Sequence, residues 1–170
     1  MISRLLIGLS ALLCVSCSAS DEPSAETLVR DLMDVWRTGD TERLASILAE
    51  DVVYDDAPNN RAHHGVVESA AYVRHVHTWA SEVKIEIVNV RAGKGAALAE
   101  WRMSAVQSAP IAGRIPVATM NPVVIRGVTI VETENGRITR AADYLDALGF
   151  VLQLGAGVDL PGGVRIGPAL

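Results

Sequence analysis

The chain has 170 residues, of which 49% are hydrophobic, and this length and composition suit one domain with a hydrophobic core. The formal net charge is -5 at pH 7, and no basic stripe is present that could meet phosphates. Binding to nucleic acids is therefore not expected.

The first twenty residues have the pattern of an export signal. Arg4 supplies a positive charge, and residues 5–15 form an apolar run that is too short for a comfortable transmembrane helix. The segment Val15-Ser16-Cys17 resembles a bacterial lipoprotein box, whose cysteine becomes the lipidated first residue of the mature chain. We expect an exported protein of the bacterial cell envelope, with lipidation at Cys17 favoured over cleavage near Ala19 or an uncleaved anchor. A lipid would then be its only attachment to the membrane.

Both cysteines, Cys14 and Cys17, lie inside this segment. The domain expected over residues 21–155 therefore has no disulfide, no thiol nucleophile and no cysteine ligand for a metal. Residues 156–170 are rich in Gly and Pro, and we expect an irregular tail there.

Helical spacing of apolar residues dominates the first part of this domain. A first helix is predicted from Leu28, Val29, Leu32, Val35 and Trp36, and Gly39 ends it. Asp40 can cap a short second helix. A third helix is predicted over residues 66–82, with one side formed by Val66, Ala70, Val73, Val76, His77 and Ala80.

A period of two marks the strands. The first strand is predicted over residues 51–56, followed by a loop over 57–65 that is rich in turn formers. Further strands are predicted over 83–90, 95–107, 123–132 and 137–146, the last two joined as a hairpin across "TENG". Helices followed by antiparallel strands indicate an α+β fold with a curved sheet wrapped by three N-terminal helices.

The stretches "RTGD", "LAEDVVYDDAP", "HHG" and "NGRITRAADYLDALGFVLQLG" occur in an order that resembles the nuclear transport factor two-like cone fold. Within that fold the chain is most similar to the SnoaL-type polyketide cyclases and the limonene-epoxide hydrolases, over about residues 25–155. The resemblance implies a cone-shaped α+β barrel and a homodimer formed through the outer face of the sheet. It does not define an activity, because the fold hosts isomerases, cyclases, dehydratases, hydrolases and binding domains.

The resemblance also assigns roles to individual residues. "YDDAP" is similar to the Tyr-x-Asn-x-Pro of the hydrolases, so Tyr54 and Asp56 fall where those enzymes hold a water. Asp143 falls on their catalytic aspartate, and the region after it supplies the acid/base aspartate of the cyclases, which makes Asp146 a reserve candidate.

Two departures separate the chain from these families. The Arg-x-Asp of the hydrolases corresponds to Trp101 and Met103, and the oxyanion tyrosine of the ketosteroid isomerases corresponds to Leu32. Neither chemistry therefore transfers intact.

With the register that the resemblance implies, strand alternation directs Trp101, Met103 and Asp143 into the cavity. Burial in an apolar wall would raise the pKa of Asp143, and Asp56 would add like-charge repulsion. Other interpretations stay open. Asp143 could pair with a surface arginine, Asp56 could form the turn before Pro58, and Tyr54 could be core packing.

The histidines do not predict a metal site. His75 and His77 are roughly 200° apart on a helix and cannot ligate one ion. His77 is more often a core histidine than a catalyst, and His63 or His64 could line the entrance of a pocket.

We therefore expect acid–base chemistry, without a metal or a cofactor, on a small apolar cyclic molecule. Asp143 would be the main acid/base, Asp56 its partner base and Tyr54 an orienting hydrogen-bond donor. The expected pocket walls are Leu32, Trp36, His77, Trp101 and Met103. The rival functions are an epoxide hydrolase and a lipoprotein that binds a hydrophobic ligand without turnover.

Overall fold

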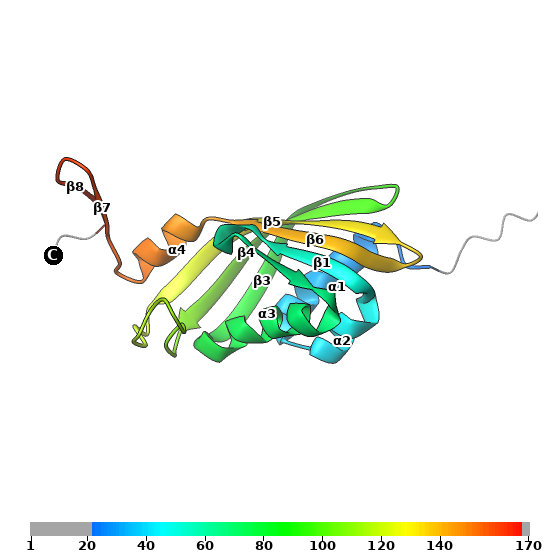
Figure 1. Ribbon diagram of the computed structural model, residues 1–170, viewed down its shortest axis with the longest axis horizontal. Helices are drawn as coiled ribbons and strands as arrows, with labels where there is room; N and C mark the ends of the chain where they lie inside the picture. Colours follow the sequence, from blue (N-terminus) through cyan, green and yellow to red (C-terminus); the bar gives the residue numbers. More distant parts are fainter. Residues whose placement is uncertain (1–21, 168–170) are drawn as a thin grey trace, which may run out of the picture.

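A computed structural model describes residues 22–167. The helices α1 to α3 lie along one face of a curved sheet, and α4 follows the last strand of that sheet (Figure 1). Their bounds are Ala25–Thr38 (α1), Thr41–Ile47 (α2), Gly65–Trp79 (α3) and Ala147–Gln153 (α4). The α+β cone architecture expected from the sequence is thus confirmed.

The main sheet has six strands in the order β2-β1-β6-β5-β4-β3. The β1–β6 pair is parallel and the other neighbours are antiparallel. The strand bounds are Leu48–Asp56 (β1), Arg61–His64 (β2), Ala80–Gly93 (β3), Ala96–Gln107 (β4), Pro122–Glu134 (β5) and Arg137–Leu145 (β6).

Local capping explains where the first two helices begin and end. The Ser24 side chain accepts a hydrogen bond from the Thr27 amide at the start of α1. Gly39 ends α1 with a left-handed φ of 74°, which favours glycine, and its amide bonds to the Val35 carbonyl. Asp40 then caps α2 by accepting bonds from the amides of Glu42 and Arg43.

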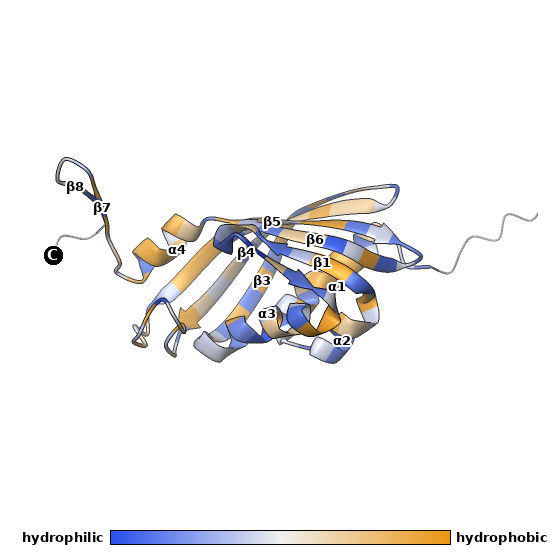
Figure 2. Cartoon of the chain, in the orientation of Figure 1, coloured by the Kyte–Doolittle hydropathy of each residue, from blue (hydrophilic) through white to orange (hydrophobic). Residues whose placement is uncertain are grey.

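The core lies between the helices and the inner face of the sheet. Apolar side chains from α1, α2 and the inner face of β1, β4 and β6 are buried together. Orange residues accordingly gather where the helices meet the strands (Figure 2). Within the described residues, no helix is both long and apolar enough to cross a membrane.

The loop predicted over residues 57–65 is wrong in its second half. A 3₁₀ turn (η1, Ala57–Asn59) and Asn60, with a left-handed φ of 50°, complete the reversal, and Arg61–His64 return as β2 against β1. The turn formers occupy only the reversal, so the residues after it are free to pair. This pairing places His63 opposite Tyr54.

The third helix ends three residues earlier than predicted. Ala80 and Ser81 pair with Gln107 and Val106 of β4, so the ladder takes these residues from the helix. Glu82 has a φ of 55°, and the register shifts between Ser81 and Lys84, which marks a bulge at the start of β3.

The C-terminal part of the chain is more regular than predicted, because a helix follows β6 and two short strands lie within residues 156–170, where an irregular tail was predicted. Asp146 caps α4 by accepting a hydrogen bond from the Gly149 amide at 2.8 Å. Beyond α4, Val158–Leu160 (β7) and Val164–Ile166 (β8) pair as a two-stranded ribbon. This ribbon lies past the end of the sheet, away from helices α1 to α3 (Figure 1).

Candidate functional site

Two buried aspartates lie side by side on the inner face of the sheet. Asp56 on β1 is in register with Asp143 on the parallel strand β6. Each is only 3% exposed, and neither forms an ion pair with a lysine or arginine among residues 22–167. Two carboxyl groups without a cation are costly to bury in ionised form, so at least one is expected to hold a proton.

The pKa of Asp143 is strongly raised. Burial raises its pKa to about 7, and the neighbouring Asp56 adds to the rise, whereas hydrogen bonds from Thr129, Tyr54 and Tyr72 act in the opposite direction. The Thr129 hydroxyl donates to Oδ1 of Asp143 at 2.6 Å, and the Tyr72 hydroxyl lies 3.5 Å from Oδ2. At neutral pH Asp143 can therefore both accept and return a proton.

Thr129 links Asp143 to an indole on the next strand. Trp101 on β4 donates from Nε1 to the Thr129 hydroxyl oxygen at 2.9 Å, and Thr129 donates in turn to Asp143. Thr129 lies opposite Asp143 in the β5–β6 ladder and is fully buried. The chain of two bonds fixes which oxygen of Asp143 receives a donor.

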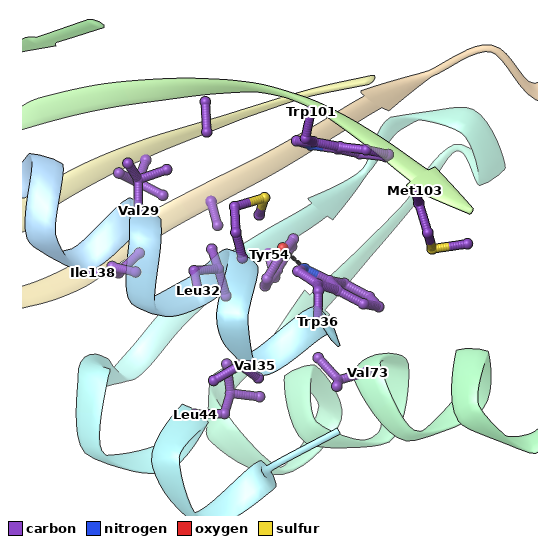
Figure 3. Packing of buried hydrophobic residues seen from close by; sticks show 14 of the residues in the cluster. Val29, Leu32, Val35, Trp36, Leu44, Tyr54, Val73, Trp101, Met103 and Ile138 are labelled. Atoms are coloured by element: carbon purple, nitrogen blue, oxygen red, sulfur yellow. Dashed lines mark hydrogen bonds between the residues drawn. The ribbon is translucent and has the colours of Figure 1, made fainter. Parts of the chain in front are cut away.

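Tyr54 is held in a second hydrogen bond. Trp36 on α1 donates from Nε1 to the Tyr54 hydroxyl oxygen at 2.7 Å, and Figure 3 shows the two side chains pointing toward one another. Burial and the nearby Asp143 raise the pKa of Tyr54 well above its usual value. The Tyr54 phenol therefore stays protonated and can serve as a donor at the site.

Tyr72 on α3 completes an aromatic cluster that the sequence analysis did not identify. Its ring stacks on His63 with centroids 4.5 Å apart and meets Trp36 edge-on at 4.9 Å and Tyr54 edge-on at 5.5 Å. Tyr72 falls three residues after Ser69 and four before Val76, so helical spacing could have placed it on the inward side of α3. It is half-buried, whereas Trp36, Tyr54 and His63 are buried.

Asp56 is positioned by the turn that follows it. The Asn59 side chain donates from Nδ2 to Oδ2 of Asp56 at 2.5 Å. Arg114, on the segment between β4 and β5, donates from its guanidinium group to Oδ1, the side-chain amide oxygen of Asn59. His63 Nε2 lies 4.0 Å from Asp56 Oδ2, which is too long for a hydrogen bond.

The remaining predicted site residues fall in different places. Met103 and Trp101 are buried on the inner face of β4 and face the interior from the side opposite Trp36 (Figure 3). Leu32 is fully buried in the core of α1. His77 donates from Nε2 to the Trp36 carbonyl at 3.0 Å, where it joins α3 to the end of α1.

Two hollows on the molecule do not contain the acids. One, of about 660 Å³, lies on the sheet and includes Val88, Arg102 and Tyr144 in its lining. Another, of about 450 Å³, lies between α2, β1 and Arg137. Neither of these two hollows is lined by Asp56 or Asp143.

The geometry defines a class of protein: a cone-shaped α+β fold with two buried acids side by side on the inner face of its sheet. A family model described as a SnoaL-like domain matches residues 29–141, which is more than half of the chain. The chain therefore belongs to the SnoaL-like domain family. No curated protein matches it.

Solved structures show the same fold at low sequence identity. A candidate polyketide cyclase from Xanthomonas campestris pv. campestris is similar with a TM-score of 0.70 and 22% identity, covering 76% of this chain and 96% of that one. TsrD from Streptomyces laurentii is similar with a TM-score of 0.66 and 23% identity, covering 75% of this chain and 92% of that one. An LEH-like epoxide hydrolase from M. tuberculosis is similar with a TM-score of 0.60 and 19% identity, covering 76% of this chain and 88% of that one. These similarities establish the fold alone.

Proposed function

We propose that the protein is an exported enzyme that performs acid–base chemistry without a cofactor on a small hydrophobic cyclic molecule. The observation that carries the proposal is the Asp143 carboxyl group, which is buried beside Asp56 and has a pKa raised to about 7. A group that changes protonation near neutral pH suits both the removal and the return of a proton.

The reaction would be an isomerisation, a cyclisation or an elimination. The Asp143 carboxylate takes a proton from an acidified carbon or oxygen of the substrate, and the resulting carboxylic acid returns that proton to another atom or to a leaving group. Tyr72 and Thr129 hold the two oxygens of Asp143, and Tyr54 supplies a protonated phenol beside it. Apolar side chains around the acids exclude water and favour an apolar ring.

The test compares Asp143→Asn with the wild-type protein over a panel of cyclic ketones, lactones and hydroxyketones. We expect turnover of at least one compound by the wild type, and a loss of about 10²- to 10⁴-fold in kcat for the variant with its circular dichroism unchanged. Asp55→Asn is the matched control, since Asp55 is the adjacent carboxylate on the other face of β1. Full activity of Asp143→Asn would refute the assignment.

An epoxide hydrolase is the first rival. Asp143 and Asp56 could hold an attacking water, but Trp101 directs its N–H to Thr129 and Met103 has no proton to give. A group that protonates the opening epoxide oxygen is therefore missing at these two positions. Turnover of any of a varied set of epoxides would favour this rival over isomerisation.

Binding without turnover is the second rival, and one observation favours it. The two acids are buried, neither of the two hollows described above includes them, and Tyr72 stacks on His63 and meets Trp36 edge-on. This rival predicts tight binding of an apolar ligand that survives conversion of both acids to amides. The enzyme proposal instead requires Tyr72 or the segment carrying Arg114 to move and admit the substrate.

Export and lipidation stay predictions, because residues 1–21 lie outside the described part of the chain. We propose that Cys17 carries the lipid. Radioactive palmitate should label the protein in a bacterial host, and Cys17→Ser should remove the label. A labelled Cys17→Ser protein would refute lipidation at this position.

The homodimer implied by the resemblance also stays a prediction. Val88, Val124 and Tyr144 are exposed on the sheet, at 58%, 45% and 49%. We propose this surface as the contact between two copies. Sedimentation velocity should show a dimer, and Val88→Glu should convert it to a monomer.

A further inference from the structure

Two buried polar atoms at the site have no hydrogen-bond partner among residues 22–167. They are Oδ1 of Asp56 and Nε2 of His63, and both belong to side chains that are buried, at 3% and 6% exposed. Leaving a buried polar atom unsatisfied costs about 1–3 kcal/mol, so a pair of such atoms needs an explanation. Both lie on the inner face of the sheet, on the neighbouring strands β1 and β2.

The two side chains do not satisfy one another, and their surroundings keep them apart. Nε2 of His63 lies 4.0 Å from the nearer oxygen of Asp56, and that oxygen already accepts from Asn59. The His63 ring is held parallel to the Tyr72 ring, at an interplanar angle of 11°. Each side chain is thus held in place with one polar atom that has no hydrogen-bond partner among residues 22–167.

The charge state of His63 limits which chemical groups of a ligand could satisfy both atoms. Burial and the nearby Arg61 lower the pKa of His63, so its imidazole is neutral at neutral pH and carries one N–H. A carboxylate oxygen needs a donor, and the imidazole needs an acceptor when its N–H is on Nε2, which is the tautomer that the subsite uses. A hydroxyl group provides both from one oxygen, whereas a carbonyl or an ether oxygen provides only the acceptor.

We propose that Asp56 and His63 form a hydroxyl-binding subsite, and that the substrate is a ring compound bearing a hydroxyl group. The substrate hydroxyl donates to Oδ1 of Asp56 and accepts from Nε2 of His63. This inference rests on the proposed function, which it sharpens from an apolar cyclic molecule to a cyclic alcohol or phenol. His63 is then a substrate-binding residue, and Asp56 binds the substrate while Asp143 moves the proton.

The same arrangement aligns the hydroxyl with the acid/base. Asp56 and Asp143 are in register on adjacent strands, and Tyr72 contacts both His63 and Asp143. A hydroxyl held between Asp56 and His63 therefore lies next to the Asp143 carboxyl group. Because Tyr72 is the half-buried member of the aromatic cluster, the ring of the substrate would reach the subsite past its side chain.

The test measures binding rather than turnover, with p-cresol and p-xylene as probes. These molecules differ by one hydroxyl in place of a methyl group. We expect the full-length protein to bind p-cresol at least about tenfold more tightly than p-xylene, from the hydrogen bond to a charged group. The preference should fall about three- to tenfold in His63→Phe, which keeps a ring to stack on Tyr72 but lacks Nε2, while Asp56 still accepts from the hydroxyl.

Two further measurements separate this inference from the proposed function. Asp143→Asn should lose turnover but keep the preference for p-cresol, and Asp55→Asn should keep both. In the wild type, p-cresol should shift the nitrogen resonance of Nε2 of His63, which needs no variant to fold. If no turnover is ever found but the preference and the shift are present, the subsite stands and the enzyme proposal fails.

Three results would overturn the subsite. They are equal affinity for the two probes in the wild type, no detectable binding of p-cresol up to its solubility, and a preference that is undiminished in a folded His63→Phe. Turnover of a ring compound without any hydroxyl, at an undiminished rate in that variant, would also contradict it.

Discussion

The two faces of β1 treat adjacent aspartates in opposite ways. Asp55 points outward and forms an ion pair with Arg140 at 2.7 Å, and Arg140 also contacts Glu132. Asp56, the next residue, points inward beside another carboxyl group and has a neutral amide as its donor. The outer face therefore neutralises its acid, whereas the inner face keeps two acids together without a cation.

This difference shows that the inner acids are not retained for stability. A paired surface carboxylate needs no explanation beyond solubility and a weak local contact. Buried, unpaired carboxyl groups cost free energy and persist where a function requires them. Each of the following predictions alters a residue on the inner face or on the outer face of the sheet and so tests this comparison.

The largest effect is expected for the pH dependence of stability. Because the pKa of Asp143 in the folded protein is about 7, above the usual ~3.9, the folded state holds this proton more tightly than the unfolded state. Its contribution to stability is fully present below about pH 4 and is lost as the pH rises through about 7. The shift corresponds to up to about 4 kcal/mol.

Asp143→Asn removes this titration. Urea unfolding of the two proteins from pH 4 to pH 8 should show the variant gaining stability relative to the wild type as the pH rises, by up to about 4 kcal/mol. Asp55→Asn should show no such gain. A constant difference between wild type and Asp143→Asn across this range would contradict the raised pKa.

A smaller effect is expected when the hydrogen bond to Asp143 is removed. The Thr129 hydroxyl lowers the pKa of Asp143, so Thr129→Val should raise that pKa further, by about one to two units. Carbon-13 NMR of the carboxyl group can follow the titration. An unchanged or lower pKa in the variant would show that this bond does not stabilise the ionised form.

The hydrogen bond between the buried side chains of Trp36 and Tyr54 should contribute to the free energy of unfolding, with an effect about as large in energy as that of the Thr129 hydroxyl on the ionisation of Asp143. Tyr54→Phe leaves the Trp36 N–H without its acceptor in the core, so we expect a loss of about 1–3 kcal/mol in the free energy of unfolding. Trp36→Phe in the same background should cost less than in the wild type, because the hydroxyl that it would orphan is already absent. Additive losses in the double variant would exclude this coupling.

The sequence predicted those features of the fold and the site that depend on residues close together in the chain better than those that depend on distant residues. The hairpin of β5 and β6 follows from strand alternation and a short turn, both local signals. The inward direction of Asp143 needed in addition the register that the resemblance implies. The fold and the pairing of Asp143 with Asp56 came from the resemblance, since periodicity does not reveal that β1 and β6 are parallel neighbours.

The partners of the two acids needed the structure. Thr129 reaches Asp143 only with the register of the β5–β6 ladder, which shifts between Glu132 and Thr133. His63 joins the site because a turn of four residues returns the chain as β2, and Tyr72 does so through the rotation of α3. A one-residue change in strand register would turn Thr129 or His63 to the other face of the sheet, and a one-residue change in α3 would rotate Tyr72 by about 100° around the helix.

The smallest effect is expected on the outer face. Asp55→Asn breaks an ion pair whose side chains are about one third exposed, at 33% and 38%. Water and salt screen such pairs, so the loss in the free energy of unfolding should be about 0.2–1 kcal/mol and should shrink at high ionic strength. Urea unfolding at low and high salt measures it. A loss as large as that of Tyr54→Phe would mean that the outer carboxylate is also part of the core, and the contrast between the two faces of β1 would fail.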